Sequence, residues 1–197
     1  PEQADKIAFD PYAVGIKHKL IEEAITVAQN KRAMIPMVNL TRYKTATLAI
    51  GNTNKTKFQE RLDSYLEVDH YNVSHSLKGL DQKSLLKDLR KYDRVIISLH
   101  QMTNKVATDF GLTRDELALI QNINRQQEVI LVIFGSPYSL KFFENIDHIL
   151  MAYEDNAETE DITAQGLVGV FGFKGKLPIT ASAIFPLHQG YTTPSLK

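Results

Sequence analysis

Residues 129–142 read VILVIFGSPYSLKF, an apolar run that ends in a turn. Its six leading apolar residues are too few to cross a membrane and are typical of a strand buried on both faces of a parallel sheet. Gly135 allows a sharp exit from the strand, Ser136 can cap a helix, and Pro137 suits the first helical position. The stretch therefore predicts a buried parallel strand that leads directly into a helix.

Apolar runs of similar length recur along the chain, separated by stretches long enough for a helix. Strands are expected at residues 46–50, 66–73, 94–99, 129–134, 148–153 and 177–181. Helices are expected at residues 17–29, 58–66, 85–92, 117–124 and 157–171. Strands joined by helical crossovers form a parallel sheet that is covered on both faces. The sequence thus predicts an α/β fold: a three-layer α/β/α sandwich with a mostly parallel sheet of five or six strands, in a flavodoxin-like arrangement.

The chain has 197 residues, which suits one domain with a substantial core. Residues 1–16 are polar and are expected to be a lead-in or linker, and residues 17–197 to form the single domain. Because the chain opens on Pro1 without a methionine, we expect it to be part of a longer protein.

Composition excludes several classes of function. Lys plus Arg equals Asp plus Glu at 23 each, so no basic field favours nucleic acid. No stretch approaches the length of a membrane span. The absence of cysteine excludes disulfides, thiolate metal sites and cysteine nucleophiles. The six histidines show no metal-ligand spacing, so the sequence predicts neither a metal site nor a cofactor.

The turn GNTNKT at residues 51–56 could hold a phosphate, as a flavodoxin loop holds that of FMN. Its candidate phosphate-binding residues are Asn52, Thr53, Asn54, Lys55 and Thr56. However, the turn has one glycine and matches neither the P-loop nor the dinucleotide-binding pattern. The favoured interpretation is a plain turn in which Thr53 or Asn54 caps the next helix. A free-standing module that binds FMN or another phosphate ligand is the alternative function.

Ligands of open α/β sheets collect beyond the carboxyl ends of the strands. The turns at these ends supply four candidates for contact with a ligand: His100, Tyr138, Glu154 and Asn156.

Neighbouring Glu154 and Asp155 point to opposite faces of an extended chain, so they make a poor catalytic pair. Asp155 with Glu158 has the spacing of a capping box, and Asn156 could cap the final helix equally well. No catalytic residue is predicted.

Three motifs carry a family resemblance: FGSPYSL at 134–140, AYEDN at 152–156 and GKLPIT at 175–180. In this order, and with IPMVNLTRYKTATLAIG at 35–51 and FPLHQGY at 185–191, the chain resembles the C-terminal α/β domain of family 3 glycoside hydrolases. The resemblance is strongest to the β-N-acetylhexosaminidase-like members. It departs from the family at Ser136, where asparagine is common, and it is loose over residues 68–127.

The resemblance implies that the catalytic aspartate, and in acetylglucosaminidase-like members the acid/base histidine, lie in a preceding (β/α)8 barrel. Some members supply a catalytic glutamate from this second domain, and Glu154 is only a positional candidate for it. The implied function is an accessory domain that packs on the barrel, shapes the substrate cleft and is inactive alone. Its implied partners are the barrel, the carbohydrate substrate of the parent and, for the isolated domain, a second copy. A parent that follows its family is periplasmic or secreted.

Overall fold

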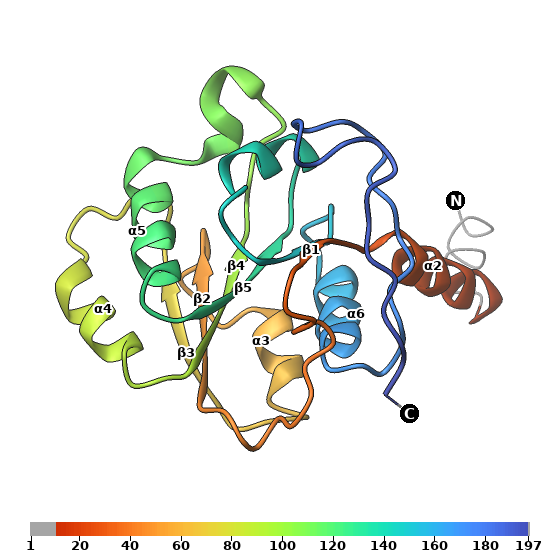
Figure 1. Ribbon diagram of the computed structural model, residues 1–197, viewed down its shortest axis with the longest axis horizontal. Coiled ribbons are helices and arrows are strands. Elements are labelled where there is room, and N and C mark those ends of the chain that lie inside the picture. Colours follow the sequence, from red (N-terminus) through yellow and green to blue (C-terminus); the bar gives the residue numbers. More distant parts are fainter. Residues whose placement is uncertain (1–10, 197) are drawn as a thin grey trace, which may run out of the picture.

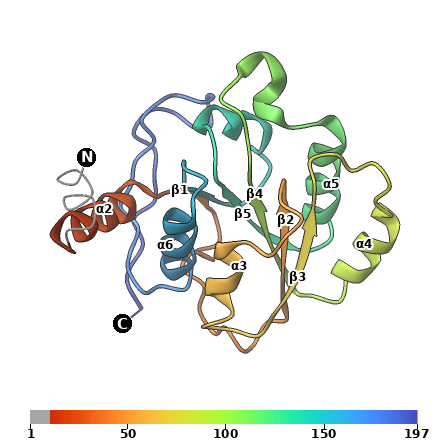
Figure 2. The same ribbon diagram turned by 180° about the vertical axis from the view of Figure 1, so that it is seen from behind.

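The computed structural model describes residues 11–196, which form an open sheet between two layers of helices (Figures 1 and 2). The strands are β1 (Thr26–Asn30), β2 (Thr45–Ile50), β3 (Val68–Val73), β4 (Arg94–Leu99), β5 (Glu128–Ile133) and β6 (His148–Met151). The helices are α2 (Pro11–Ala24), α3 (Lys57–Leu62), α4 (Gln82–Leu89), α5 (Arg114–Asn124) and α6 (Ala157–Leu167), with short 3-10 helices η1 (Val106–Gly111) and η2 (Pro137–Phe142).

The sheet has six strands in the order β1-β6-β5-β4-β2-β3. Strands β2 to β6 are parallel, and β1 pairs antiparallel with β6. If the parallel strands alone are numbered along the chain, their order is 2-1-3-4-5, which is the flavodoxin order. This confirms the predicted fold class. In this topology the order in which successive strands are added reverses between β2 and β4, so the crevice that usually receives a ligand lies there.

The two faces of the sheet bury separate apolar clusters. Along β5, alternate side chains point to opposite faces: Val129 and Leu131 pack toward α4, α5 and η2, while Ile130 and Val132 pack toward α3 and α6. Both sets are 0–2% exposed, as expected for a strand covered on both sides. The continuous apolar runs of the sequence therefore correspond to the central strands.

The beginning of the chain differs from the prediction. Helix α2 begins at Pro11, inside the expected lead-in, and ends at Ala24 instead of continuing to residue 29. Residues 26–30 form strand β1, which pairs with β6 across more than 100 residues of sequence. Ile25 and Ala28 are buried, as the apolar stripe suggested, but on an extended segment. The spacing of apolar residues along a short segment cannot reveal a strand whose hydrogen-bond partner lies far away in the sequence.

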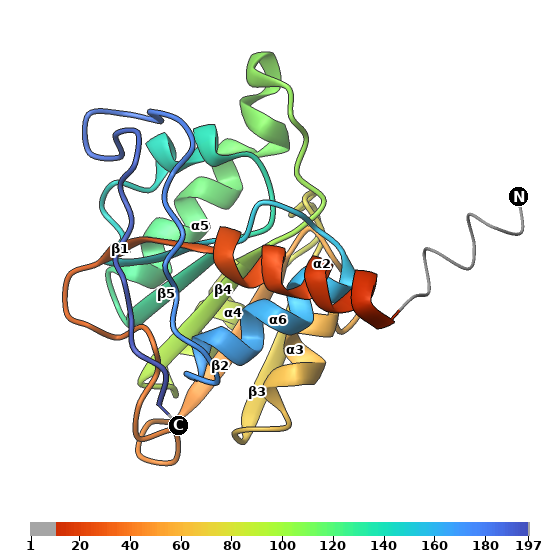
Figure 3. The ribbon, with the colours of Figure 1, turned by 90° about the vertical axis from the view of Figure 1, so that its right-hand side faces the viewer.

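The end of the chain differs as well. Helix α6 ends at Leu167 and not at residue 171, because Gly169 adopts a left-handed conformation with φ of +83° that stops the helix. Residues 177–181 do not form the expected strand. Instead the C-terminal segment passes beside β1, where Tyr191 N donates to Val27 O at 2.9 Å (Figure 3). The segment covers the β1 edge of the sheet.

Within residues 11–196, no helix combines the length and apolar character that a bilayer span requires.

Candidate functional site

The carboxyl edge is the edge of the sheet at which the parallel strands end. The last residues of β2, β4 and β5 lie in register, since Ile50 is opposite Leu99 and Leu99 is opposite Ile133. The loops that follow these strands therefore meet at one place. The sequence candidates lie in the segments that follow β2, β4, β5 and β6, all at this edge, as the predicted topology required.

The loops after β2 and β4 are in direct contact at this edge. Gly51 has φ of +97°, and a Cβ atom built on it would lie 2.3 Å from the backbone oxygen of His100. The His75 ring lies beside them, with Nε2 2.9 Å from the same oxygen and Nδ1 2.6 Å from Glu116 Oε1. The crevice between the ends of β2 and β4 is thus filled by contacts between Gly51, His75 and His100.

The residues of the turn at 51–56 are engaged with their own surroundings. Asn54 N donates to Asn52 Oδ1 at 3.1 Å, and Lys55 forms an ion pair with Asp63. Thr56 caps helix α3 through a capping box with Gln59, which corrects the expected cap at Thr53 or Asn54. The cap lies later because the exposed residues 53–55 extend the turn. These contacts give no support to a phosphate site.

A cluster of three titratable side chains, here called the His100 cluster, lies at the carboxyl edge; His100 and Glu160 are buried and Asp155 is exposed. His100 Nδ1 is 3.0 Å from Asp155 Oδ1 and 3.8 Å from Glu160 Oε1. The imidazole is 1% exposed and stacks on Phe134 with ring centroids 4.9 Å apart. His100 therefore does not reach the surface.

The carboxylates of this cluster differ in pKa. Burial would raise the pKa of Asp155, but hydrogen bonds from His100 and the Gln101 amide hold that pKa below its usual value. Burial raises the pKa of Glu160 above its usual value. At the neighbouring pair, the hydrogen bond to Glu116 raises the pKa of His75.

The structure decides between the two expected caps of α6 and corrects the one expected at Ser136. Asn156 is the cap of α6, as one alternative predicted, and its Oδ1 accepts from Thr159 N at 2.9 Å, whereas Asp155 faces His100. Ser136 precedes η2, but its side chain makes no capping bond. Its carbonyl oxygen instead accepts the Ser139 hydroxyl at 2.8 Å, because the helix that follows is a short 3-10 helix.

Two sequence candidates are exposed at the carboxyl edge. Glu154 is exposed and accepts a hydrogen bond from Asn156 Nδ2 at 3.0 Å. Tyr138, in the first turn of η2, is 46% exposed. These two side chains follow adjacent strands, β6 and β5, and could contact a molecule that covers this edge.

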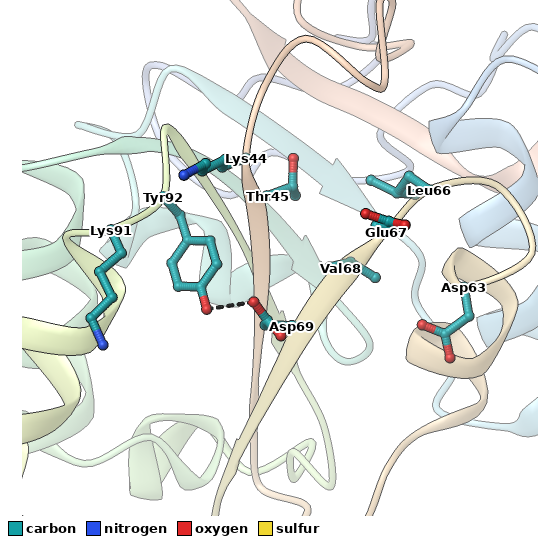
Figure 4. Close-up of a pocket in the computed structure, with 9 residues that line it drawn as sticks. All are labelled: Lys44, Thr45, Asp63, Leu66, Glu67, Val68, Asp69, Lys91 and Tyr92. Carbon is teal, nitrogen blue, oxygen red and sulfur yellow. Dashed lines mark hydrogen bonds between the residues drawn. The ribbon is translucent and has the colours of Figure 1, made fainter.

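Surface hollows lie at both ends of the sheet. An open groove of about 800 Å³ lies at the opposite end of the sheet, between the starts of β2 and β3 (Figure 4). In it Tyr92 donates a hydrogen bond to Asp69 at 2.7 Å. A smaller cavity of about 300 Å³ lies between α2 and the β6–α6 loop, and Leu20, Tyr153 and Glu154 line part of it.

This chain resembles known proteins in structure but not in sequence. No protein family model matches the sequence, and no curated protein matches it. Solved structures do match. A fungal multi-domain GH3 β-N-acetylglucosaminidase aligns over 92% of this chain, with a TM-score of 0.65 and 19% identity. A GH3 β-N-acetylglucosaminidase from Paenibacillus aligns over 86%, with a TM-score of 0.68 and 13% identity.

The fold is that of a domain found in family 3 glycoside hydrolases. A β-glucosidase from Listeria innocua also matches, over 89% of this chain, with a TM-score of 0.71 and 16% identity. The alignments cover 20%, 32% and 28% of the three matched chains, so this chain spans a third or less of their length. At these identities the likeness confirms the predicted resemblance at the level of the fold.

Sequence reasoning missed the partners of His100. Asp155 and Glu160 lie 55 or more positions further along the chain, and His75 lies 41 positions from Glu116. The order of the strands predicted that their loops would share one edge. Which side chains meet there depends on loop paths that no local pattern encodes.

Proposed function

We propose that this chain is the accessory α/β domain of a larger family 3 glycoside hydrolase of the β-N-acetylhexosaminidase-like type. In that protein it packs against a catalytic (β/α)8 barrel and contributes exposed side chains to the rim of the substrate cleft. The proposal rests on the fold. At least 86% of this chain aligns with a part of each of three glycosidases, and that part is a third or less of the length of each. The order of the FGSPYSL, AYEDN and GKLPIT motifs supports the same family.

The surface of α2 supports a covering partner. Tyr12, Ile16 and Leu20 recur every four residues, so they lie in one row along the helix, here called the α2 row. They are 75%, 45% and 65% exposed, and α2 has no buried residue. Helix α2 lies across the outside of the domain beside α6 (Figure 3). An apolar row of this kind is typical of a surface that another domain or a second copy covers.

Activity of the chain alone provides the first test. We expect no turnover of aryl β-N-acetylglucosaminide or β-glucoside, because hydrolysis needs a nucleophile and a proton donor on both sides of one bond. Saturable hydrolysis that is abolished by Glu154→Gln would contradict the proposal. Absorbance of the purified chain between 350 and 500 nm, roughly the flavin region, provides a control for FMN. A yellow protein with bound flavin would favour the alternative function.

The α2 row provides the second test, in the longest polypeptide that the source gene encodes. We expect Ile16→Lys together with Leu20→Lys to weaken packing on the barrel and to lower kcat/KM for the parent substrate. Ile184→Lys, at an exposed apolar residue of the C-terminal segment, is the matched control. Activity and heat resistance that are unchanged by the double substitution would argue against a barrel at this surface.

The isolated chain should associate through the same row. Sedimentation velocity is expected to show a dimer population that decreases in the Ile16→Lys, Leu20→Lys variant and is unchanged in Ile184→Lys. A strict monomer at all concentrations would remove the homodimer from the proposal without affecting the barrel contact.

A further inference from the structure

The His100 cluster joins three segments that are distant in sequence. His100 follows β4, Asp155 lies in the β6–α6 loop, and Glu160 lies in the first turn of α6. His100 Nδ1 lies 3.0 Å from Asp155 Oδ1 and 3.8 Å from Glu160 Oε1, and the three residues offer ligand atoms that all lie within 4.8 Å of one another. Three atoms that can each accept a positive charge thus converge on one point.

The other polar atom of each side chain is held by a group outside the cluster. Ser98 Oγ lies 2.9 Å from His100 Nε2. The Gln101 amide donates to Asp155 Oδ2 at 2.5 Å, and the Phe58 amide donates to Glu160 Oε2 at 3.0 Å. These contacts turn His100 Nδ1, Asp155 Oδ1 and Glu160 Oε1 toward one another, much as outer hydrogen bonds orient metal ligands in known sites.

The geometry suits a small divalent cation. In a tetrahedral zinc site with bonds of about 2.0–2.2 Å, ligand atoms lie about 3.3–3.6 Å apart. The separations of 3.0 Å and 3.8 Å from His100 Nδ1 bracket that range. The carboxylate of Glu160 is buried beside that of Asp155, and a cation between the two would offset the repulsion of their charges.

A cation could reach the cluster from solvent. The side chain of Asp155 is 24% exposed, whereas those of His100 and Glu160 are 1% and 11% exposed. An ion entering beside Asp155 would keep a water molecule as its remaining ligand, as in sites with three protein ligands. The imidazole ligand favours zinc or a similar transition metal over magnesium or calcium.

We propose that His100, Asp155 and Glu160 form a binding site for one divalent transition-metal ion, which fastens the loop after β4 to the start of α6. The site is independent of the proposed glycosidase function. Spacing along the sequence could not predict it, because its ligands come from three elements that only the fold brings together.

Calorimetric titration of the purified chain with Zn²⁺ tests the site. We expect one ion per chain and a higher melting temperature in the presence of Zn²⁺. Asp155→Asn and Glu160→Gln preserve shape and the oxygen that accepts from the backbone, and each should weaken Zn²⁺ binding at least about tenfold. Glu116→Gln changes another buried carboxylate at the same edge and should leave Zn²⁺ affinity unchanged.

A second measurement does not depend on the variants folding. In the unchanged chain, Zn²⁺ should shift the ¹⁵N resonance of His100 Nδ1, and Mg²⁺ at the same concentration should not. Failure of that resonance to shift at saturating Zn²⁺ would overturn the proposal, even if exposed histidines bind the ion. Zn²⁺ affinity that persists in the combined Asp155→Asn, Glu160→Gln variant would overturn it as well.

Discussion

Gly51 allows two loops of the carboxyl edge to touch. Its φ of +97° strains any side chain, and a Cβ atom would meet the His100 oxygen at 2.3 Å and His75 Nε2 at 2.7 Å. The conformation and the close approach therefore both require glycine. The single glycine of the GNTNKT turn serves loop packing, which explains its position without a phosphate ligand.

Gly51→Ala should lower the free energy of unfolding by about 3–5 kcal/mol, since backbone strain and overpacking add. Gly79→Ala is the matched control, because Gly79 also has a positive φ of +78° but has no atom within 4 Å of a built Cβ. We expect a loss of about 1–2 kcal/mol at Gly79, from backbone strain alone. Urea unfolding of both variants checks this, and equal losses would contradict the close contact at Gly51.

Thr159 and Thr163 give a second comparison between single residues. Both are buried in α6, but Thr159 Oγ1 is the one buried side-chain N or O atom without a partner among residues 11–196. Thr163 Oγ1 donates to Thr159 O at 2.6 Å. Thr159→Val should leave stability unchanged or raise it by up to about 1 kcal/mol, whereas Thr163→Val should lower it by about 0.5–1.5 kcal/mol. Thermal unfolding of the two variants measures the difference, and a clear loss for Thr159→Val would mean that its hydroxyl has a partner.

At the scale of elements, the end of α6 decides which aromatic side chain enters the core. The helix stops at Leu167, and the chain turns at Gly169 before it reaches Phe171. Phe173 is 0% exposed, and a Cβ on Gly166 would lie 2.4 Å from its ring. Phe171 is half-buried and packs edge-on against Phe173, with ring centroids 5.4 Å apart. The fully buried ring thus belongs to the segment after the helix, two positions beyond the end of the helix expected at residues 157–171.

Phe173→Ala should therefore lower the free energy of unfolding by about 3–5 kcal/mol, the usual range for a fully buried ring. Phe171→Ala should cost less than half as much, because its ring already contacts solvent. The midpoints of urea denaturation measure both. A larger loss at Phe171 than at Phe173 would restore the longer helix that the sequence predicted.

At the scale of the whole molecule, charge pairs join segments from the two ends of the chain. Asp147 lies just before β6, and Lys31 and Arg32 lie just after β1. A carboxylate oxygen of Asp147 is 3.0 Å from Lys31 Nζ, and the other is 3.3 Å from Arg32 Nη2. The hydrogen bond from Lys31 holds the pKa of Asp147 below its usual value. A carboxylate with a lowered pKa in the folded state stabilises the fold above the unfolded pKa of about 3.9 and loses this effect as the pH falls.

Asp147→Asn should accordingly make the free energy of unfolding less sensitive to pH between about 5 and 2. Glu67→Gln, at an exposed carboxylate, is the control and should retain the acid dependence of the unchanged chain. Urea titrations across this pH range provide the measurement. The effect should be modest because the Asp147 side chain is 33% exposed and solvent screens the pair. An identical acid dependence for Asp147→Asn would show that the pair does not favour the folded state.

The order of apolar and polar residues along the chain was enough to predict the α/β class, the central strands and the edge at which the candidate residues lie. Apolar runs such as 94–99 and 129–134 report burial on both faces, and the helix-length crossovers between them imply parallel strands. The tertiary structure alone decided the antiparallel strand β1, the course of the C-terminal segment and the partners of His100. The physical reason is range: burial and helical period are recorded in neighbouring residues, whereas pairing across the sheet and contacts between loops depend on segments far apart in the chain.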